Sequence, residues 1–299
     1  MIPVVLFAYK RTDVLTRTLD GLKADRIPRL IVYSDGPRGE VDVGAVNAVR
    51  SLVSSITWCE VECHFNDINL GLGRSVMRGV SETLAKYESC IVFEDDIVSV
   101  PGTYNWLCSA LDRYKDDCRV YSVTAWTNDA ITPKDVIDKP FFNGRADSLA
   151  WGTWRRAWEG MANETAIEKM ARAKTMGIDP YFYGGDLPYT ARIEMKRNLW
   201  AVRFCFHHIV NGGLVLHPQW SLVNHIGWGV QATNENGISW IDNGELKPAP
   251  RVPETWPEPI EHPLSAELLR RAYPIPWSDR FPLTVAFVRF VLRIFRFRQ

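Results

Sequence analysis

The chain has 299 residues, of which 46% are hydrophobic and 23% charged, and its 35 basic and 35 acidic side chains give no formal net charge. This composition is typical of a soluble globular protein, and the lack of excess positive charge argues against a nucleic-acid-binding protein. The six cysteines form no CxxC pair, so we expect no structural zinc site and reduced thiols in a cytoplasmic protein. No apolar run reaches the length of a membrane span.

The first 125 residues alternate between strand and helix patterns. Expected strands are 2–8, 29–35, 60–65, 89–95 and 119–125, and expected helices are 12–22, 41–56, 73–87 and 103–116. This alternation predicts an α/β fold with a mainly parallel sheet covered by helices on both faces. Ligands bind such sheets at the carboxyl ends of the strands. We therefore expect a site among four segments that follow strands, namely 9–11, 34–36, 66–73 and 94–96.

The pattern loosens after residue 126. The stretch "FFNGRADSLAWGTWRRAW" is rich in aromatic residues and glycine, "GGDLPYTARIEMKRNLWAVRFCFHHIVN" predicts one or two helices, and "GLVLHP" predicts a strand. Eight prolines between residues 248 and 277 favour an extended wrapping segment over a second core.

The run "CIVFEDDIVSVP" places Glu94, Asp95 and Asp96 side by side at the end of an apolar strand. On the triplet alone, a solvated turn is the simpler interpretation, and Asp96 could cap a short helical turn. However, two like charges about 4 Å apart repel by ~1 kcal/mol in water and by more near protein. A divalent cation relieves this repulsion, and carboxylates suit Mg²⁺ or Mn²⁺, which keep positions open for substrate phosphates.

Three other segments at predicted strand ends favour a ligand site. In "VYSDGP", Asp35 can accept from ribose hydroxyls or a base N–H, although a turn residue before Gly36 is an equal interpretation. In "NDINLGLGRSV", two glycines open a helix whose backbone N–H groups could face an anion, but the third glycine of a dinucleotide motif is missing. Arg11, in "AYKR", is a candidate for phosphate or base contact, or an ordinary solvated cation.

Taken in order, "IPVVLFAYKR", "VYSDGP", "NLGLGRSV", "IVFEDDIVSVPGTY" and "VTAWTND" resemble the Rossmann-like GT-A fold of glycosyltransferases. More narrowly, they are similar to the N-acetylglucosaminyltransferase I family and to bacterial family-2-like glycosyltransferases. The resemblance covers the first 125 residues and continues more weakly to about residue 230. It implies a nucleotide-sugar-binding half at 1–125, an acceptor and catalytic half of the same domain at 126–247, and the wrapping segment at 248–280.

The resemblance also implies roles for the polar residues. Those expected to contact the nucleotide sugar are Tyr9, Arg11, Asp35, Asn69, Arg74, Glu94, Asp95 and Trp151. Asp96, the last acid of a DxD-like element, would bind Mn²⁺ or Mg²⁺, with His225 as a second ligand. The ion would bridge the donor diphosphate and offset the charge on the leaving group. UDP is the nucleotide that the resemblance favours.

An inverting transferase also needs a carboxylate that takes the proton of the acceptor hydroxyl. Asp186, after two glycines at a predicted helix start, is the first candidate, and an ordinary N-cap is the alternative, since Pro188 lies in the first turn. Asp147, in "GRADSLAWGTW", is the second candidate. Its alternative is a loop residue that binds its own backbone.

Aromatic residues near the predicted site could stack on sugar faces. The candidates are Trp126, Trp151, Trp154 and Trp228, and we expect Trp151 to be the one in contact, although core packing is the more common role of any single tryptophan. His207 and His208 lie in an apolar helix pattern and are expected to be packed or surface residues, not ligands.

The last residues, 281–299, place Arg289, Arg293 and Arg296 on one face of an otherwise apolar helix without acids. This pattern predicts an amphipathic helix at a membrane interface, and a helix docked on the chain itself or in a dimer is the alternative. We expect peripheral association with the inner face of the membrane, where a lipid-linked acceptor would be presented.

The expected function is therefore metal-dependent, inverting transfer of a sugar from a nucleotide diphosphate sugar to a hydroxyl of a bacterial surface glycan or lipid-linked acceptor. A sugar nucleotidyltransferase is the nearest alternative, but "AYKRTD" lacks the glycine-rich loop expected after its first strand. A non-catalytic carbohydrate-binding protein is the other alternative.

Overall fold

The computed structural model describes residues 1–136, 139–227 and 246–280. Within these residues, eight strands form one sheet in the order β3-β2-β1-β4-β8-β6-β9-β7. The strands are β1 (Val4–Ala8), β2 (Arg29–Ser34), β3 (Glu60–Phe65), β4 (Ser89–Glu94), β6 (Val120–Thr124), β7 (Phe141–Asn143), β8 (Trp151–Trp154) and β9 (Leu214–His217). A second, two-stranded sheet pairs β5 (Ile97–Ser99) with β10 (Val223–His225).

The large sheet is mainly parallel. Strands β1 to β4 pair in parallel, while β8 runs antiparallel to both β4 and β6. Strand β9 is parallel to β6, and β7 is antiparallel to β9. Six strands therefore point in one direction, and only β7 and β8 oppose them. Every strand and helix predicted for residues 1–125 is present, and the architecture is consistent with a Rossmann-like GT-A fold.

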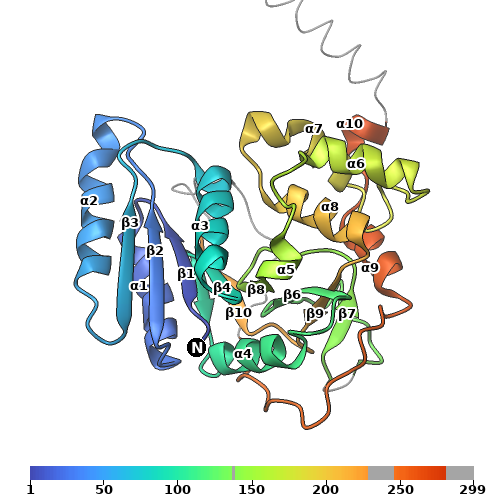
Figure 1. Ribbon diagram of the computed structural model, residues 1–299, viewed down its shortest axis with the longest axis horizontal. Coiled ribbons are helices and arrows are strands. Elements are labelled where there is room, and N and C mark those ends of the chain that lie inside the picture. The colour runs from blue at the N-terminus through green and yellow to red at the C-terminus, as the bar shows by residue number, and fades with distance from the viewer. Residues whose placement is uncertain (137–138, 228–245, 281–299) are drawn as a thin grey trace, which may run out of the picture.

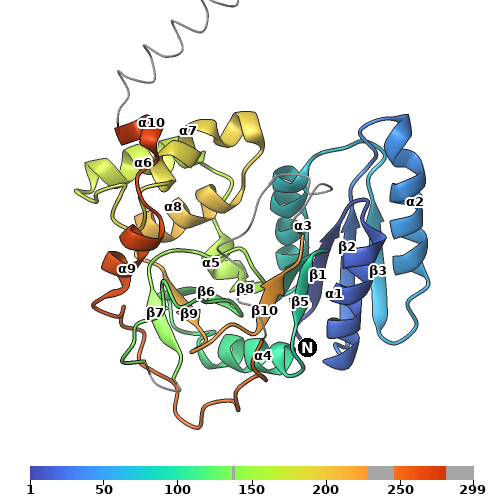
Figure 2. The same ribbon diagram turned by 180° about the vertical axis from the view of Figure 1, so that it is seen from behind.

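Helices cover both faces of the sheet (Figures 1 and 2). The helices are α1 (Thr12–Ala24), α2 (Glu40–Ser54), α3 (Leu72–Lys86), α4 (Thr103–Arg113), α5 (Arg155–Trp158), α6 (Ala166–Thr175), α7 (Leu187–Arg197), α8 (Ala201–Asn211), α9 (Ser265–Ala272) and α10 (Trp277–Arg280). Helices α1, α2 and α4 bury their apolar sides against one face, and α3 and α8 against the other, with α6 packed on α7 and α8. Alternate residues of β1 enter the two cores, as the two-residue period of a strand requires.

The later part of the chain matches the predicted helix patterns and also contains a helix that was not predicted. The two expected helix patterns after residue 184 form α7 and α8, which Asn198 separates in the left-handed conformation. Helix α6 was not predicted, although Thr165 and Glu168 form a complete capping box whose T-x-x-E spacing is visible in the sequence.

The proline-rich segment runs over α4 and then folds locally. Tyr114 donates a hydrogen bond to the Pro257 carbonyl oxygen at 2.6 Å, and the Trp256 ring lies 5.9 Å from that of Trp106. Helix α9 follows within a segment for which the proline pattern predicted only extended chain. The predicted amphipathic helix at 281–299 lies outside the described residues, and no helix within the described residues is long and apolar enough to cross a membrane.

Candidate active site

The carboxyl edge of the sheet gathers the four predicted segments. Ala8 pairs with Ser34 and Phe7 with Glu94, so the residues that follow β1, β2 and β4 leave the sheet side by side. The Tyr9 backbone N–H donates to Asp95 Oδ2 at 3.2 Å, which joins the segments after β1 and β4 directly. The strand order reverses between β1 and β4, which is where ligands bind in open α/β sheets.

Two acids of the triplet are buried and Glu94 is partly buried, so the solvated-turn interpretation is wrong. Asp95 and Asp96 are 8% and 7% exposed. Arg11 contacts both carboxylates, at 3.3 Å from Asp95 Oδ1 and closer to Asp96 Oδ2, and its Nη1 donates to the Gly227 carbonyl oxygen at 3.0 Å. Arg11 was expected to contact the nucleotide. In this structure it is a counter-ion of Asp95 and Asp96, and nucleotide contact by Arg11 stays a prediction.

Charge crowding separates the proton affinities of the three acids. Burial, together with the Asp96 and Asp95 charges, raises the pKa of Glu94 well above its usual range. Burial and Asp96 also raise the pKa of Asp95 to about 6, despite Arg11. Burial opposes ionisation of Asp96 as well, but His225 and Arg11 outweigh it and lower its pKa. Asp96 is thus the acid of the triplet that is most firmly ionised.

His225 reaches Asp96 through the small sheet. Strand β10 pairs antiparallel with β5, placing His225 opposite Ile97, and His225 Nε2 lies 3.2 Å from Asp96 Oδ2. The Ile226 N–H donates to the Asp96 carbonyl oxygen at 2.9 Å. A Cβ on Gly227 would collide with the Asp96 carboxylate, so glycine is required there. The structure therefore brings together the two predicted metal ligands.

The fit to a divalent cation depends on one oxygen. Asp96 Oδ2 faces Arg11 and His225, whereas Asp96 Oδ1 is buried and has no hydrogen-bond partner among the described residues. Nowhere in 1–136, 139–227 or 246–280 do three or more His, Cys, Asp or Glu side chains form a group that could hold a metal ion. A cation at Asp96 Oδ1 would therefore take few protein oxygens and would complete its shell with phosphate oxygens and water, as Mg²⁺ commonly does.

Asp35 is held by backbone groups of the protein, and nucleotide contact by Asp35 stays a prediction. It is 7% exposed, and its carboxylate accepts from the backbone N–H groups of Gly36 at 3.0 Å, Leu70 at 2.8 Å and Gly71 at 2.8 Å. The backbone donors before α3 do face an anion, but that anion is the protein's own Asp35. These contacts match the turn interpretation and leave Asp35 poorly placed to accept from a ribose.

The space beside the glycine loop before α3 is occupied by Asn198. A Cβ on Gly73 would collide with the backbone oxygen of Asn198, and Asn198 Nδ2 donates to the Leu70 carbonyl oxygen at 2.9 Å. The glycines therefore permit close approach of the α7–α8 turn, which corrects the expected anion cradle. Asn69 donates to the Gly36 carbonyl oxygen at 2.7 Å, and Arg74 is exposed on the first turn of α3. Donor contact by Asn69 or Arg74 stays a prediction.

Tyr9 belongs to a polar group that the sequence analysis missed. Its hydroxyl donates to Asp42 Oδ2 at 2.6 Å and accepts from the Arg38 backbone N–H at 3.2 Å. Lys10 contacts Asp42 at 2.8 Å. Burial and the Asp42 hydrogen bond raise the pKa of Tyr9 to about 12. Asp42 gave no signal in the sequence because an acid in the first turn of a helix is commonplace.

Asp147 lies at the same edge as the acidic triplet. Strand β8 pairs Trp151 with Val92 of β4, and the Ala125 N–H donates to the Ala150 carbonyl oxygen at 2.8 Å. The loop before β8 is therefore next to the ends of β4 and β6. Asp147 accepts from the Leu149 N–H at 2.7 Å, as the loop-residue alternative required. Burial nevertheless raises its pKa to about 7.

Asp186 is neither a cap nor a free carboxylate. It precedes α7, but its side chain makes no capping hydrogen bond. Arg145 instead donates to both of its oxygens at 2.8 Å, and also to the Tyr183 carbonyl oxygen at 3.0 Å. The Arg145 guanidinium lies 3.6 Å from the centre of the Tyr273 ring. Arg145 and Tyr273 were not predicted, and a single arginine or tyrosine carries no sequence signal for such a pairing.

The expected sugar contact by Trp151 is wrong. Trp151 is 1% exposed and packs in the core against Trp200 at 5.2 Å and Phe204 at 4.6 Å. Trp126 and Trp154 are also buried, and Trp228 lies outside the described residues. Core packing, the alternative considered for these residues, therefore holds for the three that the structure describes.

The two adjacent histidines of α8 are buried, as expected for packed residues. Burial lowers the pKa of His207 to about 4 and that of His208 to about 3. His207 Nε2 bonds the Ala157 carbonyl oxygen at 3.0 Å, and His208 Nε2 lies 2.9 Å from Ser122 Oγ. Both rings therefore serve the packing of α8.

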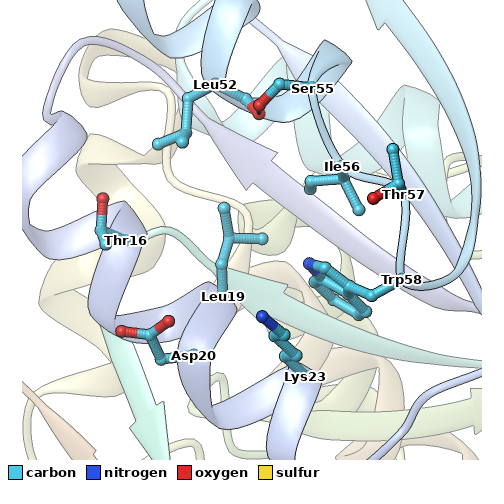
Figure 3. Close-up of a pocket in the computed structure, with 9 residues that line it drawn as sticks. All are labelled: Thr16, Leu19, Asp20, Lys23, Leu52, Ser55, Ile56, Thr57 and Trp58. Atoms are coloured by element: carbon cyan, nitrogen blue, oxygen red, sulfur yellow. Dashed lines mark hydrogen bonds between the residues drawn. The ribbon is translucent and has the colours of Figure 1, made fainter.

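A surface pocket of about 300 Å³ lies away from this edge (Figure 3). It is lined by Thr16, Leu19, Asp20, Lys23, Leu52, Ser55, Ile56, Thr57 and Trp58. Lys23 is in the last turn of α1 and Trp58 lies between α2 and the start of β3, so the pocket is near the amino edge of the parallel strands. It contains none of the predicted site residues.

No family model and no curated protein sequence matches the chain. Among solved structures, a mannosyltransferase from Pyrobaculum calidifontis in complex with GDP-Man and Mn²⁺ is 13% identical, with a TM-score of 0.40 over 58% of this chain and 52% of that one. The chain thus spans about half the length of that protein.

Two further solved structures show a similar degree of likeness. Mouse xyloside xylosyltransferase 1, in its apo form, is 8% identical, with a TM-score of 0.38 over 70% of this chain and 80% of that one. A cytidylyltransferase from Leptospira borgpetersenii is 12% identical, with a TM-score of 0.35 over 65% and 72%. Likeness at this level identifies neither a family nor a reaction.

Proposed function

We propose that the chain is a metal-dependent, inverting glycosyltransferase that uses a nucleotide diphosphate sugar. The observation that carries this proposal is the buried Oδ1 of Asp96, which has no partner among the described residues and lies at the point where the strand order reverses. A carboxylate oxygen that is buried without a partner is costly. A cation bound with a diphosphate would supply the missing partner.

The residues around Asp96 would position the donor. Mg²⁺ or Mn²⁺, when bound, would neutralise charge on the diphosphate. Asp96 would hold it through Oδ1, with His225 orienting the carboxylate through its 3.2 Å contact with Oδ2. Arg11 holds Asp95 and Asp96 in place and compensates for their charge before any ligand arrives. UDP is the proposed nucleotide, on the resemblance described above.

Asp147 is the better-supported general base. Its pKa of about 7 matches a group that exchanges protons near neutral pH. Its loop borders the end of β4, where the triplet lies. Asp186 is held at both oxygens by Arg145. In this proposal, Asp147 receives the proton of the acceptor hydroxyl as that oxygen bonds to the sugar and the bond between the sugar and the nucleotide diphosphate breaks.

The acceptor is proposed to be a glycan or lipid-linked glycan of a bacterial surface. Association of the 281–299 segment with the membrane belongs to the same proposal, and it rests on the arginine spacing of the sequence. Sugar transfer and membrane association can be tested separately, since transfer to a soluble acceptor needs no membrane.

The test is isothermal titration of the full chain with UDP, with and without Mn²⁺, followed by a panel of nucleotide sugars. We expect UDP binding to strengthen at least tenfold with Mn²⁺ and one donor to be slowly hydrolysed. Asp96→Asn should abolish both effects. The matched control is Asp112→Asn, which alters an exposed acid whose side chain is 77% accessible.

Three results would contradict the proposal. An affinity for UDP that is the same with and without Mn²⁺ would contradict the proposed metal site. Release of pyrophosphate from a nucleoside triphosphate and a sugar phosphate would identify a nucleotidyltransferase. Sugar binding without nucleotide binding would identify a carbohydrate-binding protein.

A further inference from the structure

One edge of the large sheet has no neighbouring strand within the described residues. Strands β3 and β7 lie at the two ends of the sheet (Figure 1). The proline-rich segment covers the outer side of β7, because Phe142 forms a parallel bridge with Glu261 and its carbonyl oxygen accepts from the His262 N–H at 2.9 Å. No described strand pairs with the outer side of β3. An edge of this kind presents N–H and C=O groups that can pair with another strand.

Alternate residues of β3 direct their backbone groups away from the sheet. The Glu60 N–H donates to the Pro28 carbonyl oxygen at 3.1 Å, and the Asn66 N–H donates to the Ser34 carbonyl oxygen at 3.0 Å. Because successive residues of a strand point their backbone groups to opposite sides, the even-numbered residues of β3 bond β2. The odd-numbered residues, whose N–H and C=O groups point outward, are Val61, Cys63 and Phe65.

The strand lacks the features that usually block an open edge, which are lysine, proline, a β-bulge or an unpaired charge. The sequence of β3 is "EVECHF", and its register with β2 continues without interruption. Its two acids are paired within the chain. Glu60 pairs with Arg29 at 2.6 Å. Glu62 pairs with Lys86 at 3.0 Å and lies 2.9 Å from His64. The edge of β3 is therefore suited to pairing with a further strand.

We propose that β3 is a dimerisation edge, which pairs antiparallel with β3 of a second copy of the chain about a two-fold axis at Cys63. A two-fold axis perpendicular to the sheet makes the two strands antiparallel. It places Val61 opposite Phe65 of the second copy, and Glu62 opposite His64 of the second copy. Cys63 and Phe65 are both exposed in the single chain. Apolar side chains thus meet apolar ones, and acids meet imidazoles. The inference is independent of the proposed function.

The side chains of β3 favour this register over the neighbouring ones. An axis at Val61 places Glu62 opposite Glu60 of the second copy, and an axis at Glu62 places the two copies of Glu62 opposite each other. Like charges in these positions destabilise a strand pair. An axis nearer the end of the strand moves Val61 beyond the end of the partner strand. Only the axis at Cys63 pairs all three outward-facing residues, and the three pairs then exchange about six N–H···O bonds.

The first experiment measures the mass of the full chain by sedimentation velocity between about 1 and 100 µM, where weak dimers form and dissociate. We expect a monomer–dimer equilibrium. Cys63→Pro removes an outward N–H and no hydrogen bond to β2, and edge strands tolerate proline at such a position. It should raise the dissociation constant about tenfold or more and leave the circular dichroism spectrum unchanged. Cys63→Ser keeps the N–H, so this matched control should dimerise like the wild type.

Two further readouts locate the axis. Cys63→Lys places two positive charges at the axis, so the dissociation constant should rise about tenfold or more at low salt and recover at high salt. A short bis-maleimide, which adds one thiol at each end, should link two wild-type chains through Cys63, because the Cα atoms of such a pair are about 5.5 Å apart. Cys118→Ser, at another exposed thiol, should still form the linked dimer, whereas Cys63→Ser should not.

A dimer that weakens in Cys63→Pro and Cys63→Lys and is linked through Cys63 supports the proposal. A chain that stays monomeric up to about 100 µM, or a dimer that both variants leave intact, overturns it. Association beyond a dimer also overturns it, because open pairing has no two-fold axis. Should Cys63→Pro fail to fold, Cys63→Lys against Cys63→Ser still decides, because the Cys63 side chain is exposed.

Discussion

Replacing Asp35 by alanine should destabilise the fold more than it weakens nucleotide binding. The carboxylate accepts three backbone hydrogen bonds of 3.0 Å or less and is 7% exposed. Hydrogen bonds to a charged group contribute about 1.5 kcal/mol or more each, so three of them set the expected loss at roughly 4.5 kcal/mol or more. That is a large part of the roughly 5–15 kcal/mol that keeps a domain folded.

The assay is urea unfolding followed by circular dichroism, with the free energy of unfolding extrapolated to water. Asp35→Asn keeps one acceptor oxygen and should lose about half as much as Asp35→Ala. Asp20→Ala, at an exposed acid of α1, is the control and should stay within about 0.5 kcal/mol of the wild type. A loss below about 1 kcal/mol in Asp35→Ala, combined with lost UDP affinity, would refute the loop-anchoring role and restore Asp35 as a nucleotide ligand.

Three further predictions concern residues whose roles the structure changed. Trp151→Ala should lower the free energy of unfolding by about 3–5 kcal/mol. Calorimetry should show that the folded fraction keeps its affinity for the donor. Normal stability with weaker sugar binding would contradict the core position of Trp151. Gly73→Ala should cost about 1–3 kcal/mol because its Cβ meets Asn198, whereas Gly44→Ala, in open space on α2, should stabilise by about 0.5–1 kcal/mol. Burial raises the pKa of Asp147 in the folded state to about 7. Between about pH 4 and 7, Asp147 is therefore protonated in the folded state but ionised in the unfolded state. Its contribution to the free energy of unfolding falls by up to roughly 4 kcal/mol as pH rises through that range. Urea unfolding of Asp147→Asn from pH 4 to 8 should lack this fall, and an unchanged pH profile would contradict it.

Local pattern was sufficient for the elements of the first 125 residues. The apolar run of β1 and the spacing of Val14, Leu15, Leu19 and Leu22 in α1 depend only on neighbouring residues, and the structure buries those side chains. Strand and helix periods are properties of the chain itself. The mainly parallel sheet and the meeting of polar segments at its carboxyl edge follow from that alternation.

The roles of the site residues depended on partners that are distant in sequence. Arg11 meets Asp96, Leu70 meets Asp35, and Arg145 meets Asp186, each across dozens of residues. A charged residue's function depends on whether its partner is water, a backbone amide or an opposite charge, and that choice is made by packing. For the same reason, Trp151 could be recognised as aromatic from the sequence, but only the surrounding rings place it in the core.

The sequence by itself therefore determined where strands and helices form and which end of the sheet carries the polar residues, because those features depend on short-range periodicity. The tertiary structure alone decided which carboxylates have protein partners and which oxygen of Asp96 has none within the part of the chain that the structure describes. Those outcomes depend on desolvation and on contacts between segments that only the folded chain brings together.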